Sequence, residues 1–335
     1  MIDTPYIFDY EKVPVNYNVK KENDYLVYTF ETVYKDPLYK ENETQVVHLF
    51  QPEGNVKGDI IFLHGIGPNN IPYLEWYARY FKKCGYRTSV VILPYHLERR
   101  PDNIVDGDPF YSPEPQDCVI LFHNAVKDVR RTIDLLETFK DYCEDNLFLM
   151  GVSFGGIIGT MVLALEKRIK KGILMITGAN WRWINFYSPY TEKVRTGYAT
   201  QKNSFGCDSQ EYCKKFRSDA KNFVKNNFNS IDDIFKKSPI TCYHYDPLSY
   251  AKFVKQPVLF VQAIFDKIMP KDAVKDLEYL LPNKVVKKIL AGHKSSILYR
   301  SLIGRWVVNF IEKESIEKAF QEEEKKSSQV VSSSK

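Results

Sequence analysis

The sequence predicts an α/β fold, in which helices cover a mostly parallel sheet. From about residue 24 to residue 312, strand-like apolar runs alternate with stretches of helical periodicity, and this alternation is the pattern of such a fold. The chain has 335 residues, of which 44% are hydrophobic, so it is able to bury a large core. Because α/β folds often use about 200 to 250 residues or more as one unit, we expect one domain with insertions.

Eight runs of residues are expected to form the strands of the sheet. The first two, Tyr25 to Val33 and Gln45 to Phe50, alternate apolar and polar residues and predict antiparallel strands at the sheet edge. The other six are short apolar runs, as parallel strands buried on both faces require. These six are Asp59 to Leu63, Thr88 to Leu93, Asn146 to Met150, Gly172 to Thr177, Pro257 to Gln262 and Lys284 to Leu290.

Two segments between these runs carry a helical pattern. In Asp117 to Phe139, apolar residues recur at three- and four-residue steps and form one stripe that packs on the sheet. That stripe predicts core packing and implies no cofactor. A second helix is expected from Tyr73 to Cys84, ending at Gly85, because glycine permits the left-handed turn into the next strand.

The chain between the fourth and fifth buried strands has a different composition, aromatic at first and then rich in lysine and asparagine. We expect residues 179–250 to form an inserted cap, and residues 1–178 and 251–315 to form the core. A separate domain is the alternative, which the lack of a flexible linker disfavours. Residues 320–335, rich in charge and serine, are expected to be disordered. The aromatic residues of the cap segment are Trp181, Trp183, Phe186, Tyr187, Tyr190 and Tyr198.

Charge and composition exclude several classes of protein. The net charge is only +5, without a dense basic block, so we expect no nucleic-acid partner. The N-terminus lacks the basic and apolar regions of a signal peptide, and no stretch approaches the roughly 18 apolar residues of a membrane span, which predicts a soluble cytoplasmic protein. The oligomeric state is not predicted. Reduced thiols are expected, because no CxxC pair occurs among Cys84, Cys118, Cys143, Cys207, Cys213 and Cys242.

The most informative stretch joins an apolar strand to a helix through Gly151-Val152-Ser153-Phe154-Gly155. A nucleophilic serine at such a turn projects its hydroxyl above the sheet, and the glycines on either side let strand and helix pass closely. The N–H of Phe154, at the start of the helix, would point toward the oxygen that becomes negative during attack. Ser153 is therefore predicted to be a nucleophile. A glycine-rich helix start without chemistry is the alternative, which the strand-turn-helix context disfavours.

A serine hydroxyl needs an imidazole to take its proton and a carboxylate to orient that imidazole. Of the six histidines, only His293 follows the last expected strand, where the base of such a site belongs. Asp266 follows the strand Pro257 to Gln262 and is the expected acid. Its alternative role is to cap the next helix, which Asp272 fills at least equally well. The other common acid position, residues 178–180, reads Gly-Ala-Asn and offers no carboxylate.

The loop after the strand Asp59 to Leu63 reads His64-Gly65-Ile66-Gly67-Pro68. Glycine in this loop lets the backbone approach the substrate and expose N–H groups. We expect the N–H of Ile66 to be the second oxyanion donor, with that of Gly67 as the alternative. His64 has the position of a supporting residue that binds the loop backbone, and it is not expected to act as a base.

Two pairs of residues are candidates for substrate binding. Trp181 and Trp183, directly after a strand, are candidates to line an apolar acyl or aryl pocket, although aromatic stretches equally form the core of a cap. Arg99 and Arg100 lie in a loop that leaves the sheet at its C-terminal edge, and they are candidates to bind a substrate carboxylate.

A structural role is favoured for this arginine pair. Acidic neighbours lie directly beside the two arginines in the chain, and a salt bridge with Glu98 or Asp102 is preferred over substrate binding.

Together these features resemble the α/β-hydrolase superfamily, especially its esterase-like bacterial branch, over roughly residues 45–312. The resemblance implies a central eight-stranded, mostly parallel sheet, cofactor-free acyl transfer to water, and a cap over the site. Ala263 departs from the glycine that is frequent before the acid. Serine at the nucleophile position argues against the reactions of dehalogenases and epoxide hydrolases, which carry aspartate there. The matching elements, in order, are His64-Gly65, Gly151-Val152-Ser153-Phe154-Gly155-Gly156, Asp266 and Gly292-His293.

The sequence thus predicts a serine hydrolase that cleaves a small-molecule carboxylic ester through an acyl-enzyme, with no metal and no cofactor. A thioesterase, an acyltransferase or a peptidase using the same three residues is an open alternative. A non-catalytic binding protein on the same fold is a further alternative, which the presence of all three residues disfavours.

Overall fold

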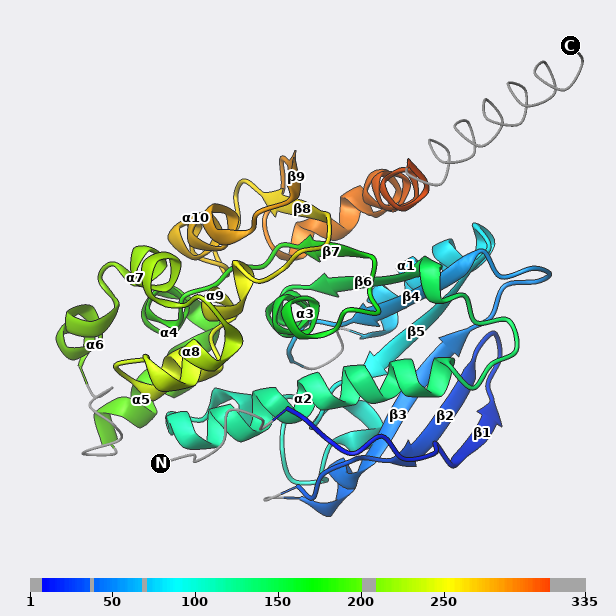
Figure 1. Ribbon diagram of the computed structural model, residues 1–335, viewed down its shortest axis with the longest axis horizontal. Coiled ribbons are helices and arrows are strands. Elements are labelled where there is room, and N and C mark those ends of the chain that lie inside the picture. The colour runs from blue at the N-terminus through cyan, green and yellow to red at the C-terminus, as the bar shows by residue number, and fades with distance from the viewer. Residues whose placement is uncertain (1–7, 37–38, 68–70, 201–208, 314–335) are drawn as a thin grey trace, which may run out of the picture.

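The computed structural model describes residues 8–36, 39–67, 71–200 and 209–313, and nine strands within these residues form one sheet (Figure 1). Their order across the sheet is β1-β2-β3-β5-β4-β6-β7-β8-β9. The first three strands are antiparallel, and β4 to β9 are parallel. The expected α/β class is confirmed. The strands are β1 Tyr17–Lys21, β2 Leu26–Glu31, β3 Thr44–Phe50, β4 Gly58–Leu63, β5 Tyr86–Ile92, β6 Leu147–Val152, β7 Lys171–Met175, β8 Val258–Ala263 and β9 Lys284–Ile289.

The strands β2 to β9 correspond to the eight expected runs, and their ends differ from the expected ends by a few residues. The sheet has one strand more, β1, which pairs with β2 through Tyr17 and Phe30. All five residues of β1 are exposed. Its first four residues do alternate between apolar and polar side chains, but the run is short and neither face of β1 is buried, and it was not among the expected strands.

Helices cover both faces of the sheet, and alternate residues of each central strand supply two separate cores. In β4, Ile61 and Leu63 belong to the core that also contains residues of α2, α3 and α10, whereas Ile60 and Phe62 belong to the core that contains residues of α1 and of the helical segment 300–313. As expected, α1 is followed by Gly85 with a left-handed φ of 92°. The helices are α1 Ile71–Lys83, α2 Pro115–Leu136, α3 Phe154–Leu165, α4 Trp181–Tyr187, α5 Glu192–Thr200, α6 Gln210–Arg217, α7 Ala220–Asn227, α8 Ile231–Lys236, α9 Pro247–Ala251 and α10 Lys271–Leu280.

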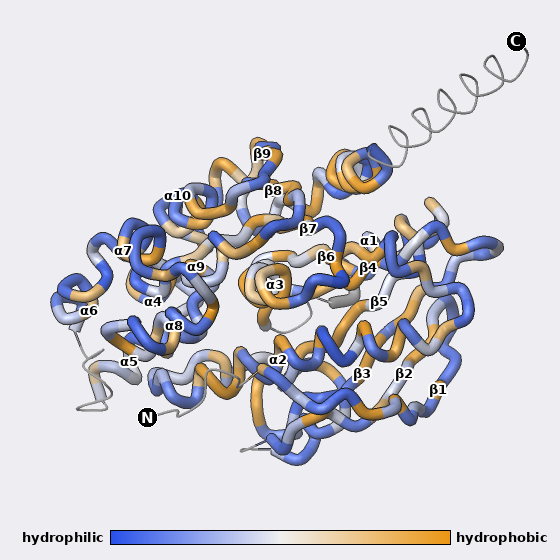
Figure 2. The backbone as a smooth tube through the Cα atoms, viewed as in Figure 1, coloured by the Kyte–Doolittle hydropathy of each residue, from blue (hydrophilic) through white to orange (hydrophobic). Residues whose placement is uncertain are grey.

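The chain between β7 and β8 folds into the helices α4 to α9. Figure 1 shows α4 to α8 grouped at the end of the molecule opposite to β1, and in Figure 2 the helices α6 and α7 are largely hydrophilic whereas α3 is mostly hydrophobic. A buried ion pair between Arg217 and Asp246 ties this segment together. Asp246 also accepts hydrogen bonds from the N–H groups of Asn180 and Trp181, directly after β7. That residues 179–250 act as a cap stays a prediction, and the expected disordered tail lies outside the described residues.

Five cysteines are present as free thiols, and Cys207 lies outside the described residues. Across the described part of the chain, no helix has both the length and the apolar character that crossing a bilayer requires.

His48 on β3 is buried between two carboxylates and makes the stability of the fold pH-dependent. Its Nδ1 lies 3.1 Å from Glu75 Oε1 and its Nε2 lies 2.8 Å from Glu98 Oε1. Burial alone would lower the pKa of His48, but the hydrogen bonds to both carboxylates raise this pKa to about 9. Since the folded-state pKa exceeds the unfolded value, the stabilisation is complete below about pH 6.5 and is lost as the pH rises toward 9.

We therefore expect His48→Gln to lower the free energy of unfolding by on the order of 3 kcal/mol at pH 6, and by much less at pH 9.5. Urea unfolding of both proteins over this pH range measures the difference. A difference that stays constant between pH 6 and pH 9.5 would show that His48 is not protonated in the folded protein.

Candidate active site

Ser153 occupies the sharp turn between β6 and α3. Its φ of 55° and ψ of −115° lie outside the regions that L-residues prefer, a strain of about 1–3 kcal/mol that the surrounding structure must hold. A Cβ added at Gly151 would lie 2.3 Å from the Gly155 carbonyl oxygen, and one at Gly155 would lie 2.2 Å from that of Leu63. Both motif glycines are therefore required, because strand, turn and helix pass too closely for any side chain.

The hydroxyl of Ser153, the ring of His293 and the carboxylate of Asp266 form a hydrogen-bonded series. His293 Nε2 lies 2.8 Å from Ser153 Oγ, and His293 Nδ1 lies 2.7 Å from Asp266 Oδ2. The two partners of the serine are nearly buried, with His293 10% and Asp266 5% exposed in their side chains. The other oxygen of Asp266 accepts the N–H groups of Ile268 and Met269, which fixes the carboxylate. This arrangement is able to pass a proton from the hydroxyl to the imidazole.

The loop that carries His293 is held by serine side chains. Ser295 Oγ accepts the N–H of Gly292, and Ser296 Oγ donates to the carbonyl of His293. Gly292, the residue before the histidine, has no feature that requires glycine. This residue has no left-handed φ, and a Cβ there would approach no heavy atom closer than 3.4 Å.

The loop after β4 lies directly beside the serine. A Cβ at Gly65 would lie 3.7 Å from Ser153 Cβ, and Gly67 has a left-handed φ of 98°. His64 supports this loop, because its Nδ1 is 2.7 Å from the Gly65 carbonyl oxygen and its Nε2 accepts the N–H of Leu93. Burial holds the pKa of His64 well below its usual value, so the ring stays neutral and serves as a structural link.

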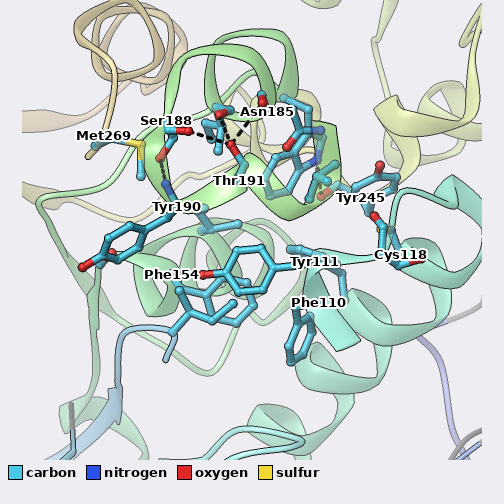
Figure 3. A pocket seen from close by; sticks show the side chains of 18 of the residues that line it. Phe110, Tyr111, Cys118, Phe154, Asn185, Ser188, Tyr190, Thr191, Tyr245 and Met269 are labelled. Atoms are coloured by element: carbon cyan, nitrogen blue, oxygen red, sulfur yellow. Dashed lines mark hydrogen bonds between the residues drawn. The ribbon is translucent and has the colours of Figure 1, made fainter. Parts of the chain in front are cut away.

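Two hollows meet at Ser153, and Ile66 and Tyr190 line both of them. The inner hollow has a volume of about 60 Å³, and in Figure 3 Phe110, Tyr111 and Phe154 lie on one side of it and Asn185, Ser188 and Thr191 on the other. The outer hollow has a volume of about 460 Å³, and His293 is one of the residues that line it. Further residues of the inner hollow are Phe122, Ile157, Trp181, Ile184, Val194 and Tyr245, and those of the outer hollow include Val152, Ile176, Lys294 and Arg300.

Of the two tryptophans expected to line a pocket, the structure brings only Trp181 to the serine. Trp181 lines the inner hollow and is 7% exposed. Trp183 lines neither hollow. Its indole N–H donates to Asp276 Oδ2 at 2.9 Å, and the guanidinium of Arg182 lies over its ring. Residues 181 and 183 are two positions apart, about 200° around an α-helix, so α4 directs the two indoles to nearly opposite sides.

The interpretation of Arg99 as a substrate-binding residue is wrong. Its side chain is fully buried and its Nη1 lies 2.6 Å from Asp128 Oδ2 on α2. The guanidinium also donates to the carbonyls of Ile92 and Asn42, so a salt bridge is present, but with Asp128 rather than with a neighbour in sequence. Arg100 is partly exposed and faces Asp106, with 3.4 Å between Nε and Oδ1, and it lines neither hollow.

We expect Arg99→Met to lower the free energy of unfolding by about 3–5 kcal/mol, because it leaves the buried carboxylate of Asp128 without its cation. Arg100→Ala is the matched control and should cost less than about 1 kcal/mol, since the Arg100 side chain is 44% exposed and lies 3.4 Å from Asp106. Urea unfolding measures both. If Arg99→Met left stability unchanged and raised KM instead, Arg99 would be a substrate contact after all.

Several residues around Ser153 were not expected from the sequence. Phe110 and Tyr111 come from a loop before α2, and Lys294 and Arg300 follow His293. Lys294 could have been predicted to lie near the site, because it follows His293 directly. Phe110 and Tyr111 could not, because hydrophobic periodicity does not indicate where an irregular segment returns to the sheet.

Comparison with known proteins identifies the fold. The structure is similar to an acetyl xylan esterase from Paenibacillus sp. R4, with a TM-score of 0.58 and 12% identity over 90% of this chain and 89% of that one. A cold-adapted esterase from an Arctic intertidal metagenomic library gives a TM-score of 0.52 and 14% identity, over 88% of this chain and 98% of that one. An acylaminoacyl peptidase of Pyrococcus horikoshii gives 0.54 and 15%, over 91% of this chain but only 50% of that one.

No family model matches the sequence, and no curated protein matches it. At identities of 12–15%, the structural likeness concerns the fold. The chain has the α/β-hydrolase fold, as its motifs predicted, and Ser153, Asp266 and His293 follow strands β6, β8 and β9 at the edge where ligands bind in open α/β sheets.

Proposed function

We propose that the protein is a serine hydrolase that cleaves carboxylic esters of small molecules through an acyl-enzyme intermediate. The observation that carries the proposal is the hydrogen-bonded series from Ser153 Oγ through His293 to Asp266, with distances of 2.8 and 2.7 Å. A serine in a strained turn, an imidazole and a fixed carboxylate in this order are the parts that nucleophilic acyl transfer requires.

In the proposed reaction, Asp266 holds the proton of His293 on Nδ1, so that the unprotonated Nε2 faces the hydroxyl of Ser153. The serine attacks the ester carbonyl while Nε2 takes its proton. The same imidazolium then gives the proton to the departing alcohol. Water enters, loses a proton to His293 and cleaves the acyl-enzyme, which restores Ser153.

The negative oxygen of the tetrahedral intermediate needs hydrogen-bond donors that are already in place. We assign this role to the N–H groups of Phe154 and Ile66, with Gly67 as the alternative to Ile66. Phe154 is the first residue of α3, and the first N–H groups of a helix have no partner within it. Ile66 lines both hollows beside Ser153, which supports its assignment.

Residues 179–250 are proposed to act as the cap of this site. Trp181 and Ile184 from α4 and Tyr190 from the following turn contribute to the hollows at Ser153, so the segment forms part of the wall that a substrate meets. The names of two similar proteins, both esterases, are consistent with an ester substrate.

Three substrate types distinguish the proposed activity from its alternatives. We expect 4-nitrophenyl acetate to be hydrolysed, and acetyl thioesters and acetyl-amino-acid anilides to be cleaved at least about 100-fold more slowly in kcat/KM. A faster thioester or anilide reaction would redirect the assignment to a thioesterase or a peptidase. No turnover of any of the three would favour a binding protein on this fold.

A further inference from the structure

The position of His293 assigns the two parts of a substrate to the two hollows. Nε2 of this histidine must give its proton to the departing alcohol, so the alcohol lies on the side of Ser153 that His293 occupies. That side is the outer hollow, which His293 lines. The acyl group, held by the carbonyl carbon that Ser153 attacks, then lies in the inner hollow beyond Phe154.

The inner hollow is largely apolar, and several of its polar groups already have partners within the protein. Asn185 Nδ2 donates to the hydroxyl of Tyr198, and Thr191 Oγ1 donates to the carbonyl of Ile184. Ser188 Oγ accepts the N–H of Tyr190, as Figure 3 shows. An apolar group therefore fits most of this hollow better than a polar group does.

The inner hollow is also small. It offers about 60 Å³, against about 460 Å³ in the outer hollow. The smaller hollow therefore favours a short acyl chain, because a long chain would meet buried side chains such as Trp181 and Val194.

The outer hollow carries positive charge. Lys294 and Arg300 line it, and no acidic residue does so among the described residues. Both cations rest on aromatic rings, Lys294 on Tyr190 and Arg300 on Trp76, and neither faces a carboxylate in the described part of the chain. An anionic alcohol would therefore meet two cations that no carboxylate neutralises.

From these observations, and on the basis of the proposed function, we infer that the substrate is an ester of a short acyl group with an alcohol that carries an anionic group. Tyr190, which lines both hollows, lies where acyl and alcohol parts meet.

The inferred preference for a short acyl group is tested with 4-nitrophenyl esters of increasing chain length. Each ester is used at a concentration at which it does not form micelles. We expect kcat/KM for the octanoyl ester to be at least about 10-fold lower than for the butanoyl ester. Ile184→Ala and Val194→Ala, which widen the inner hollow, should each raise the octanoyl-to-butanoyl ratio. Ile231→Ala, on α8 and outside both hollows, is the matched control and should leave the ratio unchanged. A wild-type protein that hydrolyses octanoyl or dodecanoyl esters as fast as butanoyl esters overturns this half.

The alcohol half is tested with 3-acetoxybenzoate and its neutral methyl ester. We expect the wild type to prefer the anion about fivefold or more in kcat/KM, and the preference to fall as sodium chloride rises from 20 to 500 mM. The double variant Lys294→Gln/Arg300→Gln should bring the ratio close to one. Arg305→Gln, an exposed arginine of the same terminal helix that lines neither hollow, is the matched control. No preference for the anion, or one that the double variant leaves intact, overturns this half.

The two kcat/KM ratios, together with Ser153→Ala, show whether a negative result contradicts the inference or the proposed function. Hydrolysis that disappears in Ser153→Ala but shows neither preference contradicts the inference alone. Hydrolysis that persists in Ser153→Ala contradicts the proposed function.

Discussion

Ser153→Ala is expected to lower kcat for ester hydrolysis by about 10⁵- to 10⁶-fold. Without the hydroxyl no acyl-enzyme forms, and the only remaining rate enhancement comes from binding and from the donors around the oxyanion. Steady-state hydrolysis of 4-nitrophenyl acetate by highly purified protein measures this loss.

The fold should survive this substitution, because alanine is smaller than serine and leaves the backbone of the turn in place. Circular dichroism and thermal unfolding close to those of the wild type establish that the loss is chemical. Ser218→Ala, at an exposed serine after α6, is the matched control and should retain the wild-type rate. Residual activity of Ser153→Ala above about 1% of the wild type would contradict the nucleophile assignment.

Asp266→Asn is expected to lower kcat by about 10⁴-fold. The asparagine oxygen is able to accept the N–H groups of Ile268 and Met269, as Oδ1 does now, so the turn is preserved. The amide nitrogen then faces His293 Nδ1, which must accept rather than donate. This places the imidazole proton on Nε2, toward Ser153, where the ring no longer serves as a base.

Asp272→Asn is the matched control for this variant. Asp272 lies in the first turn of α10, has an exposed side chain, and pairs only weakly with Lys275 at 3.5 Å. We expect its kcat to equal that of the wild type within a factor of two. A comparable loss in both aspartate variants, or no loss in Asp266→Asn, would remove Asp266 from the proposed mechanism.

The sequence predicted the sheet well, because buried parallel strands must be apolar on both faces and therefore stand out as runs. The same reasoning failed for β1, whose residues are all exposed. The turn at Ser153 could be predicted from the sequence for a steric reason, since there is no room for a Cβ at Gly151 or Gly155. The glycines of this turn are required by specific close contacts, so they predict the local structure more precisely than a run of hydrophobic residues does.

Chain order and strand ends also predicted which residues the structure brings together, and the distances from His293 to Ser153 and Asp266 agree with that expectation. Their catalytic roles stay predictions until variants are measured. The direction in which a loop side chain points could not be predicted from the sequence. Arg99 lies in a loop at the correct edge of the sheet but turns into the core to meet Asp128, 29 residues further along the chain. Such long-range pairs arise from the packing of α2 on the sheet and leave no local signal.

The most direct measurement is the covalent labelling of the protein by a fluorophosphonate probe, with the modified residue located by tandem mass spectrometry. We expect one adduct, on Ser153, and a labelling rate that falls at least about 100-fold in His293→Gln, because the hydroxyl then has no base. The absence of any adduct, an adduct on another residue, or equal labelling rates in the wild type and His293→Gln would contradict the proposal that His293 activates Ser153.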